Sequence, residues 1–545
     1  MDLWDSLTSR RSRGVLYTRA ERGYERISWR EVVRQAEAMA GSLREFGVHD
    51  GVRVAVVLTN SPHAVRGLLA IWLAGGVPAS LPLPSVGGSA EEYALRLEAI
   101  LAMLDSPLIL AEERLLPFLP PAPSRRVQVR SWESLSGSRR IDPSPPGLDE
   151  PAFIQYSSGS TDIPKGCVLT TRAITAQLEI VGSLTAGRPG AERVYSWLPL
   201  SHDMGIFGCL LYPWVSDWDL VLSTPEHFML APGTWFSDMA SFGTTLTAGT
   251  STALHLAVRA QGRRRLPDKL ALRGCVVGAE RVEHDTLRRT VEVFEPYGLQ
   301  PNAFIPAYGL AEAALAVTAC PPLAEPKTLA VDTLRLAGGD VVHVETDSPG
   351  AALLVSAGPP CKGVRIRTGD HRKVAGIQVS SPSLASGYFA DPVRTRNHFV
   401  DGWMQTGDLG FQHDGELYVV GRDDDLISVT GRNVYAREVE WTVAGLEPLR
   451  KGCVVVMDVA LRGRSRLILL AETKHNVDDY DGLATRASRI AARKAGITLH
   501  ECVFVASGAL PKTPSGKVQR YRCRELLLEE RFRPLARVVL SDEQC

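Results

Sequence analysis

A regular alternation of apolar strands and amphipathic helices in the first 110 residues most constrains the fold of this chain. Val52–Leu58 is a short, largely apolar run, Pro62–Leu73 has helical spacing, and Val77–Leu83 is mostly apolar again. The amphipathic segment Glu91–Leu104 then leads to a further apolar run, Leu108–Ala111. Apolar strands that alternate with helices are typical of parallel sheets covered on both faces. The pattern therefore predicts an α/β fold built on a parallel sheet.

The rest of the chain predicts more than one domain, because 545 residues are too many for a single core. The α/β alternation resumes after a Pro-, Ser- and Arg-rich connection at about 117–150, whereas residues 316–350 show no clear period. Short alternating strands follow over about 353–420, and a charged break at Gly421–Asp425 precedes a small α+β region. We expect an N-terminal domain, 1–422, with two α/β sheets and a β-rich part, and a C-terminal domain, 423–545.

Composition narrows the class of protein. Lys plus Arg equals Asp plus Glu, 61 each, so the net charge is zero and no nucleic-acid partner is indicated. The nine cysteines are scattered without a C-x-x-C pair, which predicts reduced thiols rather than disulfides or a zinc site. No run of about eighteen apolar residues occurs, so we expect no membrane span, and no signal peptide is evident. These features predict a cytoplasmic enzyme.

The segment Gln155–Cys167 is small, hydroxylated and glycine-rich between two apolar runs. Its backbone N–H groups and hydroxyls can approach an anion closely, and a lysine adds positive charge. The residues concerned are Ser157, Ser158, Gly159, Ser160, Thr161 and Lys165. We predict a phosphate-binding loop here, although it lacks the spacing of a P-loop. A flexible surface turn is the alternative interpretation.

Several further motifs follow this loop along the chain. They are His202–Gly205, Val277–Arg281, Ala307–Glu312, Thr406–Gly410, Gly421–Tyr435 and Leu510–Val518. In this order the set resembles the adenylate-forming superfamily of acyl-CoA ligases, amino-acid adenylation domains and luciferases. The resemblance covers nearly the whole chain. It implies that an acyl-adenylate is made from a carboxylic acid and ATP, that the acyl group then passes to a thiol, and that the C-terminal domain is a mobile lid.

The resemblance also implies an ATP site. Ser157–Lys165 would grip the β- and γ-phosphates, and Glu312 with Thr161 would hold Mg²⁺, a hard cation that prefers oxygen ligands. Asp408 would accept hydrogen bonds from the ribose hydroxyls, and Arg422 would reach the ribose or the phosphates. The wall for adenine would consist of Gly278, Ala279, Glu280, Tyr308 and Gly309, with Tyr308 as the stacking face.

Two residues of the C-terminal region take roles from the same resemblance. Lys517 is similar to the mobile lysine that contacts the carboxylate and the α-phosphate, where a cation stabilises the charge of the transition state. Asp424 resembles the hinge about which the lid swings. The alternative interpretations are a solvated lysine on a glycine turn and a charged surface turn. Lys517, Glu312 and His202 are the catalytic candidates.

Within the superfamily the chain is most similar to the fatty acyl-AMP ligases. Trp197–Gly205 and Tyr308–Ala314 have their form, and about forty residues separate Glu312 from Leu353, longer than most connections. Val331–Leu334 lies in that stretch, as a similar run does in the insertion of those enzymes. The insertion is thought to disfavour coenzyme A, so the resemblance implies transfer to the phosphopantetheine thiol of a separate acyl carrier protein.

The acyl site is the least determined part. His202, Met204 and Phe207 are expected to line its opening, with His202 either a gate between the two sites or a hydrogen-bonded core histidine. Asp203 leaves an amino-acid substrate open, since amino-acid-activating relatives pair an aspartate near this place with the α-amino group. Asp162–Lys165 is closer to the form of CoA ligases than to that of fatty acyl-AMP ligases. An acyl-CoA ligase and a catalytically silent adenylate-binding partner are therefore further alternatives.

Overall fold

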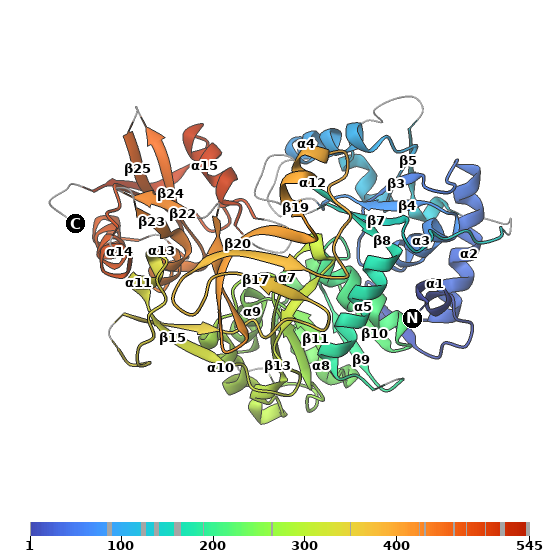
Figure 1. The fold of residues 1–545 in the computed structure, drawn as a ribbon, viewed down its shortest axis with the longest axis horizontal. Coiled ribbons are helices and arrows are strands. Elements are labelled where there is room, and N and C mark those ends of the chain that lie inside the picture. Colours follow the sequence, from blue (N-terminus) through green and yellow to red (C-terminus); the bar gives the residue numbers. More distant parts are fainter. Residues whose placement is uncertain are drawn as a thin grey trace.

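The structure is a computed structural model in which the chain extends from the N-terminal region, blue in Figure 1, to the C-terminal region, red at the opposite end. It describes residues 2–83, 90–120, 127–135, 141–156, 165–188, 190–262, 265–348, 350–423, 426–429, 432–461, 464–475, 477–495, 497–512 and 518–540. The fold is mixed α/β, with a large N-terminal part of several sheets and a smaller C-terminal part, as the sequence predicted.

The first sheet has six strands in the order β6-β5-β3-β4-β7-β8, parallel except for the last pair. Its strands are β3 (Arg53–Val56), β4 (Val77–Ser80), β5 (Leu108–Ala111), β6 (Gln128–Ser131), β7 (Pro151–Tyr156) and β8 (Gly166–Thr170). Helices α3 (Pro62–Leu73) and α4 (Ala90–Leu104) lie between these strands in the chain, and α2 (Trp29–Glu45) precedes β3. The predicted strand–helix alternation is confirmed.

Local sequence explains where the helices of this region begin. The Ser28 hydroxyl accepts a hydrogen bond from the Glu31 N–H (3.2 Å) and caps α2, while Pro62 occupies the first turn of α3 behind its cap Ser61. Part of the connection at 117–150 packs against the first sheet. It contributes the edge strand β6, and Trp132 is buried against α3, where a Cβ at Gly67 would clash with the indole.

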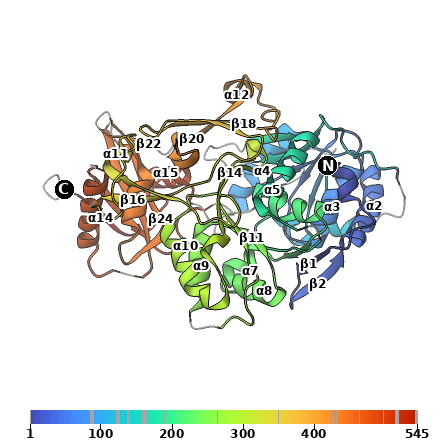
Figure 2. The same cartoon turned by 60° about the horizontal axis from the view of Figure 1, so that its bottom comes forward.

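The second sheet has eight strands in the order β14-β13-β12-β11-β9-β10-β1-β2, parallel from β13 to β1 and antiparallel at each edge. Its strands are β1 (Val15–Arg19), β2 (Tyr24–Ser28), β9 (Arg193–Ser196), β10 (Asp219–Leu222), β11 (Leu246–Gly249), β12 (Gly274–Val277), β13 (Phe304–Gly309) and β14 (Ala316–Ala319). Figure 2 shows β1 and β2 together at one border of the molecule. The carboxyl ends of parallel strands are where ligands bind in such sheets.

Helices of different kinds flank this sheet. They are α1 (Leu3–Leu7), α5 (Thr171–Thr185), the π-helix η3 (Met204–Leu211), α6 (Tyr212–Val215), α7 (Pro225–Leu230), α8 (Thr234–Phe242), α9 (Ser251–Gln261) and α10 (His284–Phe294). Residues from both sheets, among them Leu16, Leu220, Val56 and Leu110, meet in one buried apolar cluster. The two sheets therefore share a core.

The region that follows differs from the expected irregular stretch at 316–350. It contains β14, β15 (Thr328–Asp332) and α11 (Thr333–Ala337), and β15 pairs with β16 (Ala351–Val355). Strand β16 therefore belongs to the insertion rather than to the β-rich sheet. That sheet consists of β17 (Arg365–Arg367), β18 (Ala375–Ser380), β19 (Phe399–Val400), β20 (Trp403–His413) and β21 (Glu416–Arg422), with α12 (Pro392–His398) beside it.

The C-terminal part has a small sheet of four strands, β24-β25-β26-β27, and a β-hairpin. Its elements are β22 (Leu426–Val429), β23 (Arg432–Tyr435), α13 (Ala436–Val443), β24 (Leu449–Leu461), β25 (Arg464–Thr473), α14 (Tyr480–Ala495), β26 (Glu501–Val505), α15 (Arg520–Leu528) and β27 (Pro534–Val539). The predicted exposed break begins too early, because Gly421 is buried and Arg422 is the last residue of β21. The division at 422/423 stays a proposal.

The composition predicted free cysteines and no membrane-spanning helix. The cysteines of the described ranges, which leave out Cys545, are all free and buried. Among the helices that the structure describes, none combines the length and apolar character needed to cross a membrane.

Candidate functional site

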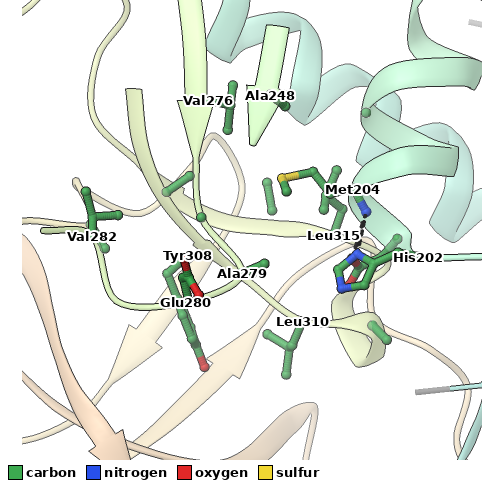
Figure 3. A pocket seen from close by; sticks show the side chains of 18 of the residues that line it. His202, Met204, Ala248, Val276, Ala279, Glu280, Val282, Tyr308, Leu310 and Leu315 are labelled. Atoms are coloured by element: carbon green, nitrogen blue, oxygen red, sulfur yellow. Dashed lines mark hydrogen bonds and ion pairs between the residues drawn. The ribbon is translucent and has the colours of Figure 1, made fainter. Parts of the chain in front are cut away.

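A cavity of about 450 Å³ runs between the carboxyl ends of β12 and β13 and the sheet face under α5 and η3. We call its two parts the polar arm and the apolar arm. The polar arm is lined by Lys165, Gly278, Tyr308, Glu312, Asp408 and Arg422. The apolar arm is lined by Val181, Leu184, Met204, Gly208, Ala248 and Val276, among others. His202 and Leu310 lie where the two arms meet (Figure 3).

The turn after β12 forms one wall of the polar arm. A Cβ at Gly278 would lie 2.8 Å from the Ala307 carbonyl oxygen, so only glycine allows β13 to approach this closely. Ala279 has a φ of 64°, a conformation that costs energy for a residue with a Cβ and often marks a functional site. The Glu280 carboxylate accepts hydrogen bonds from the N–H (2.6 Å) and the hydroxyl (3.1 Å) of Thr252. That carboxylate therefore ties the turn to the first turn of α9.

Tyr308 and Arg422 converge on Asp408 from two different sheets, Tyr308 from β13 and Arg422 from β21, the strand paired with β20. The Tyr308 hydroxyl donates to Asp408 Oδ2 at 2.6 Å, and Arg422 Nε lies 3.3 Å from Asp408 Oδ1. Burial, together with the Asp408 carboxylate, raises the pKa of Tyr308, so the hydroxyl stays a donor. A Cβ at Gly309 would lie only 1.9 Å from the Leu315 carbonyl oxygen. The predicted residues Gly278, Tyr308, Gly309, Asp408 and Arg422 are thus brought together.

Glu312 also lines the polar arm. Its carboxylate Oε1 accepts a hydrogen bond from the Tyr388 hydroxyl at 2.9 Å, and the Lys165 ammonium lies 5.6 Å from the centre of the Tyr388 ring. Sequence reasoning missed Tyr388, because nothing local to Ser386–Phe389 indicates that this segment crosses to Glu312. The structure therefore adds Tyr388, which contacts both Glu312 and Lys165.

The segment His202–Met204 lies between the two arms. The Met204 backbone nitrogen lies 3.3 Å from His202 Nδ1 (Figure 3). The same ring nitrogen lies 2.5 Å from Asp203 Oδ1. The Asp203 carboxylate also accepts from the Met204 N–H at 2.7 Å. The prediction for Phe207 is wrong. It was expected at the opening of the acyl site, but it is fully buried, packs edge-on against Phe153 and does not line the cavity.

The apolar arm lies between the eight-stranded sheet and the helices α5 and η3. In the π-helix η3, Met204 and Gly208 lie four positions apart and both face the cavity, and π-helices are frequent at functional sites. Ala248 and Val276 close the arm from the sheet side (Figure 3). These residues lie far apart in the sequence, so no single-sequence pattern could assemble them.

The C-terminal part completes the cavity. Val518, Gln519, Arg520 and Tyr521 line it, and Arg520 is held by the Glu440 carboxylate (Nη2–Oε2, 3.0 Å) and the Val456 carbonyl oxygen (2.7 Å). Several predicted residues lie outside the described residues. They are Ser157, Ser158, Gly159, Ser160, Thr161, Asp424 and Lys517.

A titratable carboxyl group next to the Gly278–Glu280 turn provides a test by pH. Burial raises the pKa of Glu283 to about 7, although the Thr286 hydroxyl donates to it at 2.6 Å. A carboxyl group whose pKa is raised by folding favours the folded state below its unfolded-state pKa, near 4.5. That stabilisation is lost as the pH rises through the folded-state pKa of about 7. We expect Glu283→Gln to melt roughly 2–4 °C above the wild type at pH 8 and close to it at pH 5, measured by calorimetry.

The control for this measurement is Glu295→Gln, which changes an exposed glutamate just after the same helix. Its melting temperature is expected to follow that of the wild type at both pH values. An equal offset between Glu283→Gln and the wild type at pH 5 and pH 8 would contradict the prediction.

Comparison with known proteins gives the family. The family of AMP-binding enzymes matches residues 6–389. A 4-hydroxyphenylalkanoate adenylyltransferase of Mycobacterium marinum is 29% identical over 548 residues, which cover 94% of this chain and 88% of that protein. A putative fatty-acid–CoA ligase of Mycobacterium tuberculosis is 28% identical over 557 residues, 93% of each chain.

A solved structure from studies of fatty acyl-adenylate ligases of E. coli and L. pneumophila is also similar. It superimposes with a TM-score of 0.88 at 25% identity, over 97% of this chain and 98% of that one. The match to the family over most of the chain and the shared fold agree with the geometry of the cavity. This chain therefore belongs to the AMP-binding enzymes and is an adenylate-forming ligase that activates acids with ATP.

Proposed function

We propose that this protein is a fatty acyl-AMP ligase that uses ATP and Mg²⁺ and passes the acyl group to the phosphopantetheine thiol of a separate acyl carrier protein. The observation that carries the proposal is the continuity of the two arms of the cavity. An arm with carboxylates and cations opens directly into an arm lined by aliphatic side chains. A molecule that is ionic at one end and apolar along the rest fits both.

The residues of the polar arm fit a nucleotide. Asp408, oriented by Tyr308 and Arg422, offers carboxylate oxygens to ribose hydroxyls, and the turn Gly278–Glu280 with the Tyr308 ring forms a flat wall suited to adenine. Lys165, the last residue of the proposed phosphate loop Ser157–Lys165, would face the phosphates.

Mg²⁺ would be held by Glu312, with Thr161 and the phosphates, and would neutralise charge on the leaving pyrophosphate. Within the described ranges no group of three or more acidic, His or Cys side chains is placed to hold a metal ion. One carboxylate is nevertheless enough for this role, because Mg²⁺ is commonly bound by one or two carboxylates plus substrate phosphates.

The proposed chemistry has two steps. A carboxylate oxygen of the acid bonds to the α-phosphorus of ATP while the bond from that phosphorus to pyrophosphate breaks. The thiol sulfur of the carrier then bonds to the acyl carbon, AMP leaves, and the thiol proton is released. His202, held by Asp203, lies where the acid carboxylate must sit between the arms, and Lys517 would neutralise the charge that develops on phosphorus.

The packing of the insertion supports a carrier protein rather than coenzyme A as acceptor. Val331 and Leu336 are buried against β20 and β21, whereas Ala337 packs into the apolar cluster of the C-terminal part. Helix α11 lies beside α14 in both overall views (Figures 1 and 2). A segment packed on both parts would restrict how the proposed lid, residues 423–545 with Asp424 as hinge, swings to admit a small free thiol.

Three other functions have less support. An acyl-CoA ligase would use the same two arms, and the form of Asp162–Lys165 favours it. An amino-acid substrate would need a free carboxylate near its amino group, but one oxygen of Asp203 is already in contact with His202 and Met204. A silent adenylate-binding protein would not need Glu312, Asp408, Arg422 and Lys517 together.

The test incubates the pure protein with ATP, Mg²⁺ and a panel of acids, with either coenzyme A or a holo-carrier protein. The panel includes fatty acids of increasing length, 4-hydroxyphenylalkanoates and amino acids. We expect acid-dependent pyrophosphate release and acyl-carrier product, measured by a coupled assay and by mass spectrometry. Abundant acyl-CoA without acyl-carrier product would support the acyl-CoA ligase instead, and no pyrophosphate with any acid would support the silent protein.

A further inference from the structure

The segment Ser383–Phe389 connects two parts of the site that are far apart in sequence. Alongside β8, the Phe389 N–H donates to the Gly166 carbonyl oxygen (2.7 Å) and the Val168 N–H donates to the Gly387 carbonyl oxygen (3.0 Å). At its other end, the Ala385 N–H donates to the Glu312 carbonyl oxygen at 2.8 Å. The segment is therefore attached both to the strand that follows Lys165 and to the turn that carries Glu312.

The Tyr388 side chain also connects these two parts, because it contacts the Glu312 carboxylate and the Lys165 ammonium. Its hydroxyl donates to Glu312 Oε1 at 2.9 Å, and its ring receives the Lys165 ammonium 5.6 Å from the centroid. The ring is buried and packs edge-on against Phe399 (5.5 Å), while the Tyr388 N–H donates to the Thr395 hydroxyl at 2.9 Å. Tyr388 does not line the cavity itself.

We infer that Tyr388 is a positioning residue that holds Glu312 and Lys165 in a fixed arrangement for the two phosphates that leave. This inference rests on the proposed function, which places both charges on the pyrophosphate side. The hydroxyl engages one carboxylate oxygen of Glu312, which leaves the other for the cation on the phosphates. The ring face offers the ammonium a weakly polar support that does not neutralise it.

A positioning residue such as Tyr388 is needed because Glu312 and Lys165 carry opposite charges. A carboxylate and an ammonium that contact the same tyrosine can turn toward each other, and a partly buried ion pair of that kind would remove both groups from the nucleotide. Tyr388 gives each group a separate contact, the hydroxyl for Glu312 and the ring for Lys165. The site is thereby preorganised before ATP binds.

The hydroxyl and the ring should have separable effects. Tyr388→Phe removes the hydrogen bond to Glu312 but keeps the ring, so ATP binding should weaken about tenfold with saturating Mg²⁺ and change little in EDTA. Tyr388→Leu also removes the ring beneath Lys165, so ATP binding should weaken about fivefold in EDTA as well. Affinities are measured on the full chain by isothermal titration of ATP without acid, and kcat and KM for ATP by pyrophosphate exchange.

The control is Tyr24→Phe. The Tyr24 hydroxyl also donates to a carboxylate, Asp238 Oδ2 at 2.6 Å, and neither residue lines the cavity. We expect ATP binding by this variant to equal that of the wild type in Mg²⁺ and in EDTA. The melting temperatures of all variants show whether a loss of affinity follows only from a loss of stability.

The outcomes separate the inference from the proposed function. Wild-type affinity of Tyr388→Phe in Mg²⁺ would overturn the role of Tyr388, and so would equal losses in Mg²⁺ and EDTA for that variant. A wild-type protein that binds no ATP would instead overturn the proposed function on which the inference rests.

Discussion

Replacing Lys517 by alanine is expected to lower the rate of acyl-adenylate formation by roughly 10²-fold or more, the scale of a lost transition-state contact. Negative charge grows on the α-phosphate as the acid carboxylate approaches, and one cation placed there lowers the barrier. The residues that directly follow Lys517, Val518 to Tyr521, line the cavity. Because the contact would be made mainly in the transition state, kcat should fall while the affinity for ATP changes little.

The measurement for Lys517→Ala is acid-dependent exchange of pyrophosphate into ATP, with ATP binding determined separately. Lys362→Ala is the matched control, since Lys362 is exposed and does not line the cavity. It should exchange pyrophosphate at the wild-type rate. A Lys517→Ala variant that retains wild-type kcat would exclude this lysine from the adenylation step.

Replacing Gly208 by leucine is expected to change which acids are used rather than whether the enzyme works. A Cβ at Gly208 would lie 3.2 Å from Leu315 Cδ2, across the apolar arm, so a larger side chain must occupy the space of the acyl chain. A leucine side chain displaces about three or four methylenes, each worth about 0.8 kcal/mol when buried. We expect kcat/KM for long acids to fall roughly 10²-fold, with short acids much less affected.

The test for Gly208→Leu compares kcat/KM across a series of straight-chain acids. Short acids serve as the internal control for folding and for the polar arm. Ala248→Leu approaches the same space from β11 and should shorten the preferred acid in the same way. A uniform loss of activity at all chain lengths, in both variants, would mean that the acyl chain does not occupy this arm.

The fold was largely predictable because its main signals are local. Apolar strands such as Val52–Leu58 and helix starts such as Ser28 depend on neighbouring residues, and the structure has both. The region 316–350 was predicted poorly for the opposite reason. Strand β15 is stabilised by pairing with β16, about twenty residues further along, so its own sequence shows little period.

The site residues also divide into those that local sequence predicted and those that it did not. Tyr308, Asp408 and Arg422 were found because each belongs to a short motif. In the structure Asp408 lies 2.6 Å from the Tyr308 hydroxyl and 3.3 Å from Arg422 Nε. Met204 was named for the acyl site and lines the apolar arm, whereas Tyr388 and the other residues of that arm were missed and Phe207 was misplaced. Which face of a helix meets a cavity depends on packing, and the π-helix turns Gly208 rather than Phe207 toward the acyl space.

The sequence by itself determined the class of fold, the family resemblance and the ordered motifs, because strand propensity, capping and motif spacing act over a few residues. Only the tertiary structure decided that Tyr388 joins Glu312 to Lys165, that the insertion packs on the C-terminal part, and which side chains wall the apolar arm. Tyr388, for example, is 76 residues from Glu312 and 223 from Lys165 in the chain. The partners in such contacts are selected by the free energy of burying apolar and hydrogen-bonding groups together, which no local pattern encodes.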